Sequence, residues 1–294
     1  MARANFVMLA ALAPVLLLSG QHRAQAAESY DSCTAFVSVL PTVISSQGTY
    51  CLRSDLSTAI TSGNAIDIQA NNVTIDCNHF ALNGLPAGPD TQANGISTSG
   101  AIRDNAIVRH CSVRGFHYGI SLGNGTGDGA GYVVENNRLE GNTYVGISVF
   151  GDGSIVRRNL VINTGGSTLH YYPNGIVAAG SVDILDNTIS GVKAATGTNG
   201  GATGLGILNS PGSSIVGNRV RGLSPDGTGP AYGIDFPGTG RIAVRHNDLK
   251  GSPLAGSIGV RCNTAEQRAK DNVVNGFTTS ISSCGDAGGN DLSH

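Results

Sequence analysis

The chain has 294 residues, of which 40% are hydrophobic and 13% charged, with 43 glycines and a formal net charge of −2. This composition fits a globular protein that buries a core, and it excludes a disordered chain. The mild negative charge excludes the basic footprint typical of a nucleic-acid-binding protein. The glycines lack the triplet period of collagen and stand where aliphatic runs begin and end. They therefore predict a turn-rich, all-β protein.

Residues 1–26 differ from the rest of the chain. Arg3 is followed by an apolar run over residues 6–18 and then by "AQA" (24–26), a small-x-small cleavage pattern. These features predict a signal peptide. The apolar run is shorter than the ~20 residues that span a bilayer, so no membrane insertion is expected. We expect the mature protein to be secreted or periplasmic.

The cysteine content predicts disulfides rather than a metal site. An even number of cysteines in an exported chain favours three bridges. No Cys-x-x-Cys or paired-His spacing argues for zinc, so neither a metal nor a cofactor is expected. Fifteen pairings are formally possible. Closeness in sequence favours Cys33–Cys51, Cys77–Cys111 and Cys262–Cys284.

A short phrase recurs along the chain, as "YGISL" (118–122), "VGISV" (145–149), "NGIVA" (174–178) and "YGIDF" (232–236). Its aliphatic residue serves as a marker, and successive markers are 21–31 residues apart. The markers are Ile66, Ile96, Ile120, Ile147, Ile176, Ile207, Ile234, Val260 and Ile281.

A second phrase lies between the markers, for example "VVENNRLEG" (133–141). Its Asn column comprises Asn137, Asn159, Asn187, Asn218, Asn247 and Asn272, with Cys111 in an earlier copy. Each copy thus holds three short strand-like pieces that cannot bury a face alone, so the copies must stack into a solenoid. Asn suits a tight bend, since it tolerates left-handed backbone and can hydrogen-bond to the copies above and below.

Together with "NNVTIDCNHFALNG" (71–84), these phrases resemble the right-handed parallel β-helix repeat of the pectin-lyase-like superfamily, over roughly residues 63–284. The resemblance implies an all-β parallel β-helix of about nine coils over residues 63–294. Residues 27–62 are expected to form an N-terminal cap. Because the superfamily includes polysaccharide lyases, glycoside hydrolases, epimerases and phage tailspikes, the resemblance implies a polysaccharide ligand.

Alternation along each strand assigns the residue after each marker to the outer face. This outer column is Asp67, Ser97, Ser121, Ser148, Val177, Leu208, Asp235, Arg261 and Ser282. Glycoside hydrolysis uses two carboxylates within about 10 Å. The column offers only Asp67 and Asp235, six coils and roughly 29 Å apart at ~4.8 Å per coil. Asp235 and Arg261, on adjacent coils, are expected to form an exposed ion pair.

Two further aspartates, Asp128 and Asp152, fall in turns of adjacent coils. They could come close enough to bind a cation, although ordinary turn aspartates are the simpler interpretation. Whether they bind a cation stays open.

Polar aromatic residues gather just before the marker phrase on one edge of the predicted solenoid. They are His117, Tyr118, Tyr144, His170, Tyr171, Tyr172 and, two coils later, Tyr232. A tyrosine ring with a polar tip suits a sugar ring and its hydroxyls. The longest insertions (164–173, 192–204 and 223–231) lie nearby, and such loops often carry binding surfaces. This edge is therefore the predicted ligand face.

Two classes of function fit these residues. In the first, the protein is a polysaccharide lyase acting on uronate glycans, which needs a base, an acid and a neutraliser of the carboxylate. The candidates are His117, Tyr144, His170, Tyr171 and Tyr172 as base and acid, Arg261 as neutraliser, and Tyr118, Tyr232 and Asp235 as substrate-binding residues. In the second, the protein is a non-catalytic glycan-binding or structural surface protein. The oligomeric state and the substrate stay open.

Overall fold

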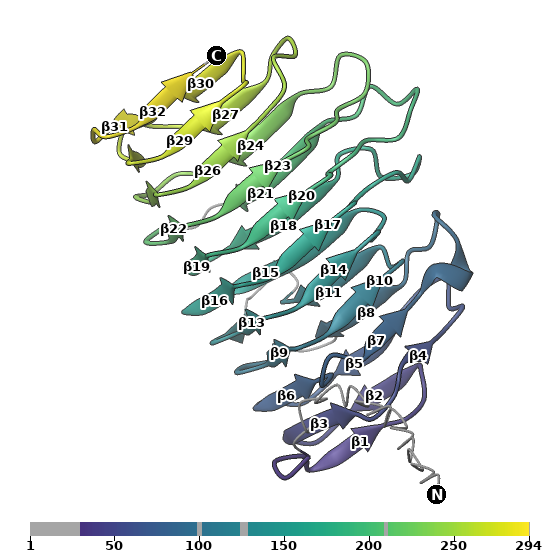
Figure 1. Cartoon of the computed structure of the whole chain (residues 1–294). Coiled ribbons are helices and arrows are strands. Elements are labelled where there is room, and N and C mark those ends of the chain that lie inside the picture. Colours follow the sequence, from purple (N-terminus) through teal and green to yellow (C-terminus); the bar gives the residue numbers. More distant parts are fainter. Residues whose placement is uncertain (1–29, 99–101, 124–128, 209–210, 294) are drawn as a thin grey trace, which may run out of the picture.

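The computed structural model describes residues 30–98, 102–123, 129–208 and 211–293. Over these residues the chain winds into a right-handed parallel β-helix, with its coils stacked from the N-terminal to the C-terminal end (Figure 1). The all-β fold predicted from the repeat is therefore confirmed. The predicted signal peptide and Asp128 lie outside the described residues. No described helix is long and apolar enough to cross a membrane.

Three parallel sheets form the walls of the β-helix. Sheet A consists of β1 (Ala35–Val37), β3 (Gly48–Leu52), β6 (Val73–Asp76), β9 (Ile107–Arg109), β13 (Val133–Glu135), β16 (Ser154–Arg157), β19 (Val182–Leu185), β22 (Ser214–Val216), β25 (Ala243–Arg245), β28 (Arg268–Lys270) and β31 (Gly285–Asp286).

Sheet B carries the marker phrase. It consists of β2 (Thr42–Ile44), β5 (Asn64–Ile68), β8 (Asn94–Thr98), β11 (Tyr118–Leu122), β15 (Val145–Asp152), β18 (Asn174–Ala179), β21 (Ala202–Leu208), β24 (Ala231–Asp235), β27 (Ile258–Arg261) and β30 (Thr279–Ser282), and β12 (Gly129–Ala130) pairs with the end of β15.

Sheet C closes each coil. It consists of β4 (Leu56–Ser57), β7 (Ala81–Asn83), β10 (Ser112–Arg114), β14 (Arg138–Glu140), β17 (Leu160–Ile162), β20 (Thr188–Ser190), β23 (Arg219–Arg221), β26 (Asp248–Lys250), β29 (Val273–Asn275) and β32 (Asp291–Ser293), with the short 3-10 helix η1 (Leu85–Ala87) after β7.

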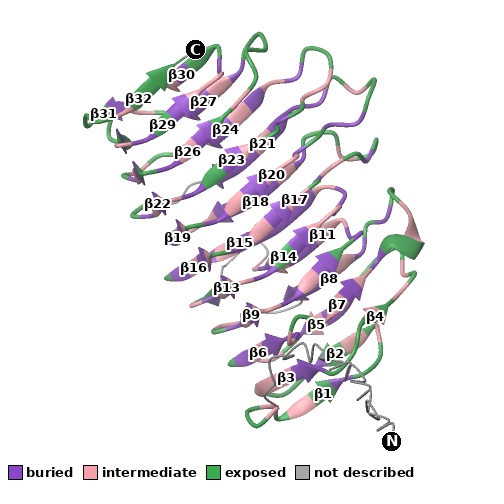
Figure 2. Cartoon of the chain, in the orientation of Figure 1, coloured by how far each residue is buried: buried purple, intermediate pink, exposed green. Residues whose placement is uncertain are grey.

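The core is a stack of aliphatic side chains that runs the length of the molecule. The markers from Ile66 to Val260 are fully buried, and Ile281 in the last coil is partly buried. In Figure 2 the buried residues recur in the strands of successive coils along the stack. The inward orientation predicted for the markers is therefore confirmed.

In the middle coils of sheet B, the glycine before the first inward aliphatic residue, such as Gly175 before Ile176 and Gly204 before Leu205, is required by close packing. A Cβ added to Gly175 would lie 2.7 Å from the carbonyl oxygen of Gly204, and one added to Gly204 would lie 2.6 Å from that of Gly233. Both would also press on core side chains of sheet C, Ile189 and Val220. The recurrent Gly-aliphatic pair is thus the place where one coil passes directly over the next and no side chain fits.

One coil departs from the predicted register. Ile176 pairs with Leu205, and Val177 pairs with Gly206, so Ile207 lies two residues beyond the marker position. Gly206 then pairs with Asp235. Leu208 does point outward as predicted and is exposed, but it pairs with Ala179, so its assignment to the outer column beside Val177 was wrong and Gly206 takes that position. Both Leu205 and Ile207 are buried, which is why the hydrophobic pattern alone did not separate the two alignments.

The Asn column forms a buried hydrogen-bonded ladder. The Nδ2 of Asn187, for example, donates to the Oδ1 of Asn218 at 3.0 Å and to the Val156 carbonyl at 2.9 Å. Its Oδ1 accepts from both the backbone N–H and the Nδ2 of Asn159, each at 3.0 Å. The ladder ends at Asn290, which the repeat pattern missed.

The left-handed residue at this bend is the one before the Asn, as at Arg158 (φ 53°), Asp186 (φ 55°) and His246 (φ 54°). The expectation that the Asn itself takes this conformation was wrong. The Asn is selected for its amide, which satisfies backbone groups of two neighbouring coils.

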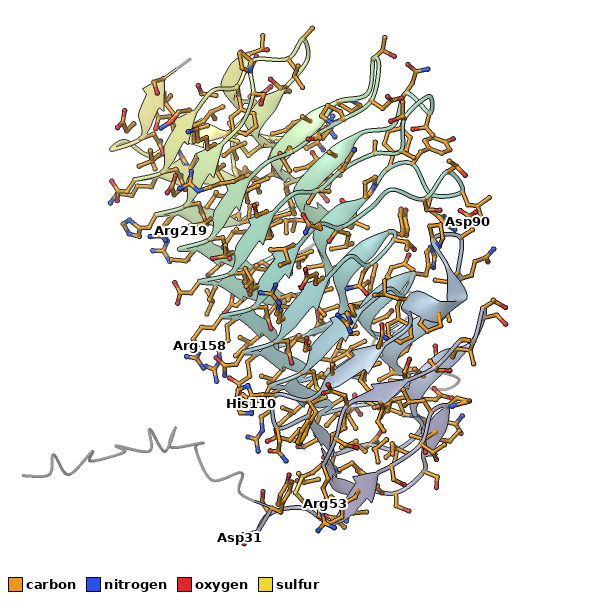
Figure 3. The ribbon with its side chains drawn as sticks, turned by 45° about the vertical axis from the view of Figure 1, so that its right-hand side comes forward. Asp31, Arg53, Asp90, His110, Arg158 and Arg219 are labelled. Carbon is orange, nitrogen blue, oxygen red and sulfur yellow. A yellow bond between two sulfur atoms is a disulfide. The ribbon has the colours of Figure 1, made fainter. Side chains whose placement is uncertain are left out.

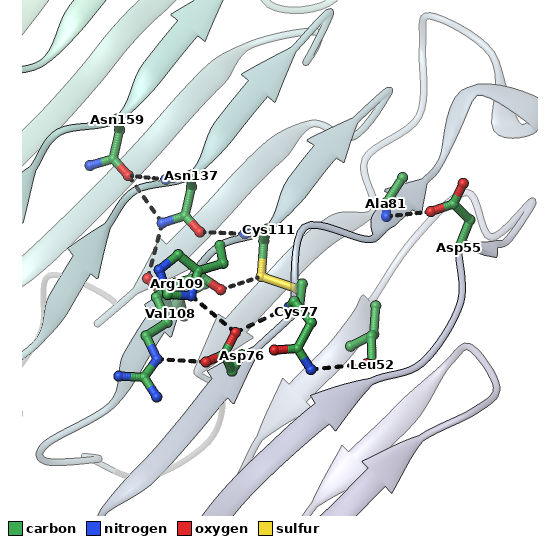
Figure 4. Close-up of a disulfide and its surroundings, with 12 residues drawn as sticks. Leu52, Asp55, Asp76, Cys77, Ala81, Val108, Arg109, Cys111, Asn137 and Asn159 are labelled. Carbon is green, nitrogen blue, oxygen red and sulfur yellow. Dashed lines mark hydrogen bonds and ion pairs between the residues drawn. A yellow bond between two sulfur atoms is a disulfide. The ribbon is translucent and has the colours of Figure 1, made fainter. Parts of the chain in front are cut away.

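The three predicted disulfides are present: Cys33–Cys51, Cys77–Cys111 and Cys262–Cys284, with Cα–Cα distances of 5.8, 4.7 and 5.0 Å. Figure 4 shows the second bridge where the Asn ladder begins, since the Cys111 backbone N–H donates to the Oδ1 of Asn137 at 2.9 Å. The bridge therefore occupies the position that an Asn holds in the later coils.

Candidate functional site

A groove lies on the outer face of sheet B, with a volume of about 280 Å³. Its lining residues come from β11, β15, β18, β21 and β24 and the turns beside them: Tyr118, Tyr144, Val145, Ser148, Phe150, Asn174, Val177, Gly206, Leu208 and Asp235. Ser148, Val177 and Gly206 are consecutive members of the outer column and form its floor. Ser148 and Val177 are only 2% and 9% exposed although they point outward. The surrounding side chains therefore enclose the floor.

Gly206 gives the groove its depth. Its outer neighbours are Val177 and Asp235, so every adjacent coil has a side chain where this coil has none. A Cβ at this position would lie 2.8 Å from the Oδ1 of Asn174. Asn174 is itself oriented, because its Nδ2 donates to the Tyr172 carbonyl at 2.9 Å. The amide oxygen of Asn174 is thus held over the gap that Gly206 leaves.

Four polar aromatic rings pack together at one end of the groove. The ring of His117 stacks on that of Tyr144 at 5.1 Å between centroids, with 12° between planes, and lies 4.1 Å from the ring of His170. Tyr118 meets His117 and Tyr144 edge-on at 4.7 and 5.5 Å. Only the two tyrosines line the groove. The structure therefore brings together four of the predicted site residues, with the histidines behind the tyrosines.

The loop over residues 164–173 carries His170 and brings its ring against that of His117. Its Ser167 hydroxyl donates to Asp90 at 3.4 Å, a contact between residues 77 apart in sequence. Figure 3 shows Asp90 on the loop side of the molecule. The Nε2 atoms of His117 and His170 are buried and have no hydrogen-bond partner among the described residues. Neither Nε2 atom is placed to reach a ligand in the groove.

Burial determines the protonation states in this cluster. It lowers the pKa of His117 to about 4, and the neighbouring His170 adds to the effect. It raises the pKa of Tyr118 to about 12, and the neighbouring Tyr144 adds to that effect. At neutral pH His117 is therefore uncharged, and the Tyr118 hydroxyl keeps its proton and can donate it in a hydrogen bond.

The other end of the groove carries a charged cluster. Arg261 donates from Nε and Nη2 to the two oxygens of Asp235 at 2.6 and 2.8 Å, and from Nη1 to the Tyr232 hydroxyl at 2.9 Å. Its guanidinium lies 4.0 Å from the centre of the Tyr232 ring. The predicted ion pair is present, but the Asp235 side chain is only 13% exposed, so the expectation of an exposed pair was wrong. These contacts use both carboxylate oxygens of Asp235, and they hold the guanidinium of Arg261 in place.

The remaining predicted residues lie apart from the groove. The rings of Tyr171 and Tyr172 contact each other in a tilted arrangement, 5.0 Å between centroids, and these residues are 44% and 49% exposed. Asp152 accepts a hydrogen bond from the Ser181 backbone N–H at 2.9 Å, which is an ordinary turn contact. Within the described residues, no group of three or more His, Cys, Asp or Glu side chains could hold a metal ion.

The sequence analysis missed seven of the groove residues as candidate site residues: Val145, Ser148, Phe150, Asn174, Val177, Gly206 and Leu208. Ser148 was assigned to the outer column, so that column could have indicated the floor. For Asn174 and Gly206 the required signal was the register of β21, which the repeat pattern did not provide. Phe150 extends β15 beyond the repeat phrase, and the pattern held no information on its position.

No protein-family model and no curated protein matches the sequence. Among solved structures, the catalytic domain of Agl-KA aligns with a TM-score of 0.48 and 11% identity over 89% of this chain, which spans 61% of that domain. The A-module of the mannuronan C-5 epimerase of Azotobacter vinelandii aligns with a TM-score of 0.34 and 14% identity, over 84% of this chain and 83% of that module. The alginate lyase of a Paenibacillus species aligns with a TM-score of 0.35 and 13% identity, over 83% of this chain and 92% of that lyase.

Proposed function

We propose that this protein is exported and binds a polysaccharide chain through the groove on sheet B. The observation that carries the proposal is the pairing of two tyrosine rings at one end of the groove with hydrogen-bonding groups along its floor. Its volume of about 280 Å³ lies just below the range for drug-sized ligand sites, roughly 300–1,000 Å³, which suits a single sugar unit of a longer chain. Export is supported by the predicted signal peptide and by three disulfides, which persist in oxidising compartments.

The groove offers the two kinds of contact that a sugar ring needs. The rings of Tyr118 and Tyr144 provide apolar surface for the C–H faces of the sugar. Tyr118 is a hydroxyl donor, while the oxygens of Asn174 and Ser148 can accept from sugar hydroxyls. His117 and His170 act as positioning residues, because their rings pack behind the tyrosines.

The charges in the groove favour an uncharged sugar unit over a uronate. Among the described lining residues there is no Lys, Arg or His, and the one charged side chain is the carboxylate of Asp235. Arg261, the predicted neutraliser, already binds both oxygens of that carboxylate. A uronate carboxylate in the groove would meet a like charge without a free cation beside it.

A polysaccharide lyase is the second candidate function. The observation that favours it is that Tyr118 and Tyr144, residues of the type that can act as acid or base, line the groove in contact with an uncharged His117. The raised pKa of Tyr118 suits the acid role rather than the base role. Catalysis then requires Tyr144 as base.

The experiment is a binding screen of neutral and uronate polysaccharides, run in parallel with measurement of ultraviolet absorbance from unsaturated product. Tyr118→Ala and Tyr144→Ala should each weaken binding about tenfold, since stacked aromatic contacts are worth roughly 0.5–1.5 kcal/mol beyond the area that they bury. The matched control is Tyr171→Ala, an exposed tyrosine outside the groove, which should leave binding unchanged. Equal loss in all three variants would contradict the proposal. Turnover by the parent that is lost in Tyr144→Ala would favour the lyase.

A further inference from the structure

A second hollow, with a volume of about 750 Å³, lies on the outer side of sheet A near the C-terminal end of the β-helix. It is lined by Gly212, Ser213, Ser214, Arg241, Ile242, Ala243, Ala265, Glu266 and Arg268. Most of these side chains are small, and the long ones are two arginines and one glutamate. The hollow exists because small residues of neighbouring coils, such as Ser214 and its register partner Ala243, leave space between the longer side chains.

Exposed cations collect around this hollow on two adjacent strands. Arg268 and Lys270 alternate along the outer face of β28, and Lys270 pairs in register with Arg245 of β25. Arg241 stands just before β25. Neighbouring strands are ~4.8 Å apart, so the four charges form one patch. The nearby acids are Glu266 in the lining, Asp183, whose Oδ1 accepts from the backbone N–H of the lining residue Ser214 at 2.9 Å, and Asp271, whose carboxylate lies 3.8 Å from the Lys270 Nζ.

Three of these arginines are unpaired, whereas six of the ten other arginines in the described part of the chain form ion pairs. Ion pairs within the described residues occupy Arg109, Arg138, Arg157, Arg158, Arg221 and Arg261. Over the same residues, the side chains of Arg241, Arg245 and Arg268 take part in no ion pair or side-chain hydrogen bond. Each therefore presents a guanidinium fork that can bind a carboxylate or a sulfate through two parallel hydrogen bonds.

We propose that this hollow is a second glycan site, which binds the acidic groups of a carboxylated or sulfated polysaccharide. The hollow is larger than a single inorganic anion needs, and the cations extend over two strands, which fits a charged chain. A hollow without aromatic lining residues does not provide the stacking platform of a single-stranded nucleic-acid site. A membrane surface would need exposed large apolar residues, and none of the described ones lies in this lining.

The test compares a patch variant with a charge-matched control. The patch variant is Arg241→Gln with Arg268→Gln. The control is Arg219→Gln with Lys250→Gln, which removes two exposed cations from sheet C; Figure 3 shows Arg219 at the edge of the molecule, where its charge faces solvent. The probes are dextran sulfate for sulfate, polygalacturonate for carboxylate, and uncharged dextran, each at about 50 and about 200 mM salt.

The parent is expected to bind at least one of the two anionic chains more tightly than dextran, with affinity that falls as salt rises. Any binding of dextran belongs to the groove and should not depend on salt or on the arginines of the hollow. The Kd of the patch variant for the anionic chain should rise about a hundredfold, roughly tenfold for each charged hydrogen-bonding side chain that is removed. The Kd of the control variant should rise less than about threefold. A variant with lysine in place of both arginines should bind more tightly than the glutamine variant but more weakly than the parent. Lysine keeps the positive charge but lacks the planar guanidinium that forms two parallel hydrogen bonds.

Three results would overturn the proposal: equal losses in the patch variant and the control, no preference of the parent for either anionic chain over dextran, or equally tight binding of single-stranded DNA. The site is independent of the groove on sheet B. A Tyr118→Ala variant should bind dextran sulfate or polygalacturonate as the parent does, so failure of one site can be distinguished from failure of the other.

Discussion

Replacing Gly206 by valine should close the groove without unfolding the protein. The φ angle of Gly206 is not among the positive values of this chain, so a side chain is compatible with the backbone. Its register neighbour in the outer column is Val177, so a β-branched side chain suits the position. Replacing a glycine inside a strand should raise the free energy of unfolding by roughly 0.5–1 kcal/mol, because the unfolded chain loses conformational freedom.

The opposing term comes from Asn174. Its Oδ1 would be 2.8 Å from the new Cβ, so the amide must turn away and lose its hydrogen bond to the Tyr172 carbonyl. That loss amounts to roughly 0.5–1.5 kcal/mol. The two terms nearly cancel, and we expect the free energy of unfolding to change by less than about 1 kcal/mol.

Binding should respond very differently, because the valine methyl groups occupy the floor of the groove, where we propose that the sugar binds. We expect at least a tenfold rise in Kd, equivalent to about 1.4 kcal/mol. The assay is glycan binding by calorimetry together with urea denaturation. The control is Gly204→Val, two residues earlier, whose Cβ would lie 2.6 Å from the Gly233 carbonyl oxygen in the core. That variant should fold poorly. A folded Gly206→Val protein that binds every glycan as the parent does would refute the proposal that the groove is the glycan-binding site.

The remaining predictions concern the ladder, the histidine stack and the ion pair. Asn187→Ala should lower the free energy of unfolding by about 3–5 kcal/mol, since it leaves buried groups of adjacent coils without partners. Asp186→Ala, at the left-handed position beside it, should lower it by no more than about 1–2 kcal/mol in the same urea titration. The pKa of His117 is lowered to about 4 in the folded protein, so the unfolded chain binds more protons between about pH 6.5 and 4. Stability should therefore fall as the pH falls through that window, by about 1–2 kcal/mol after allowance for solvent screening, and a nuclear magnetic resonance titration that finds His117 protonated at pH 6 would contradict this. Arg261→Gln removes the partner of the mostly buried Asp235 carboxylate and should lower thermal stability by about 1–2 kcal/mol; an unchanged melting temperature would show that the pair contributes nothing.

The sequence was informative wherever the structure repeats. The inward markers, the Asn column and the three disulfide pairs were all predictable, because coils stacked at a constant rise place equivalent residues above one another. The cluster of polar aromatics was also visible, since its members precede the marker phrase in consecutive coils. Its place at one end of a groove was not.

Only the tertiary structure decided the features that depend on register or on contacts between distant segments. The register of β21 puts Gly206 in the outer column, although "LGIL" aligns equally well two residues away, because both alignments bury aliphatic side chains. The loop that Ser167 anchors to Asp90 carries His170 to the ring of His117, and no local pattern encodes a contact between residues 77 apart. Whether an arginine is paired, as Arg261 is, or unpaired, as Arg268 is, depends on which side chain the neighbouring coil presents. A repeat sequence therefore determines the stack of coils and its core. The features of the proposed ligand sites arise where individual coils depart from the repeat, and those departures become visible only once the coils are placed side by side.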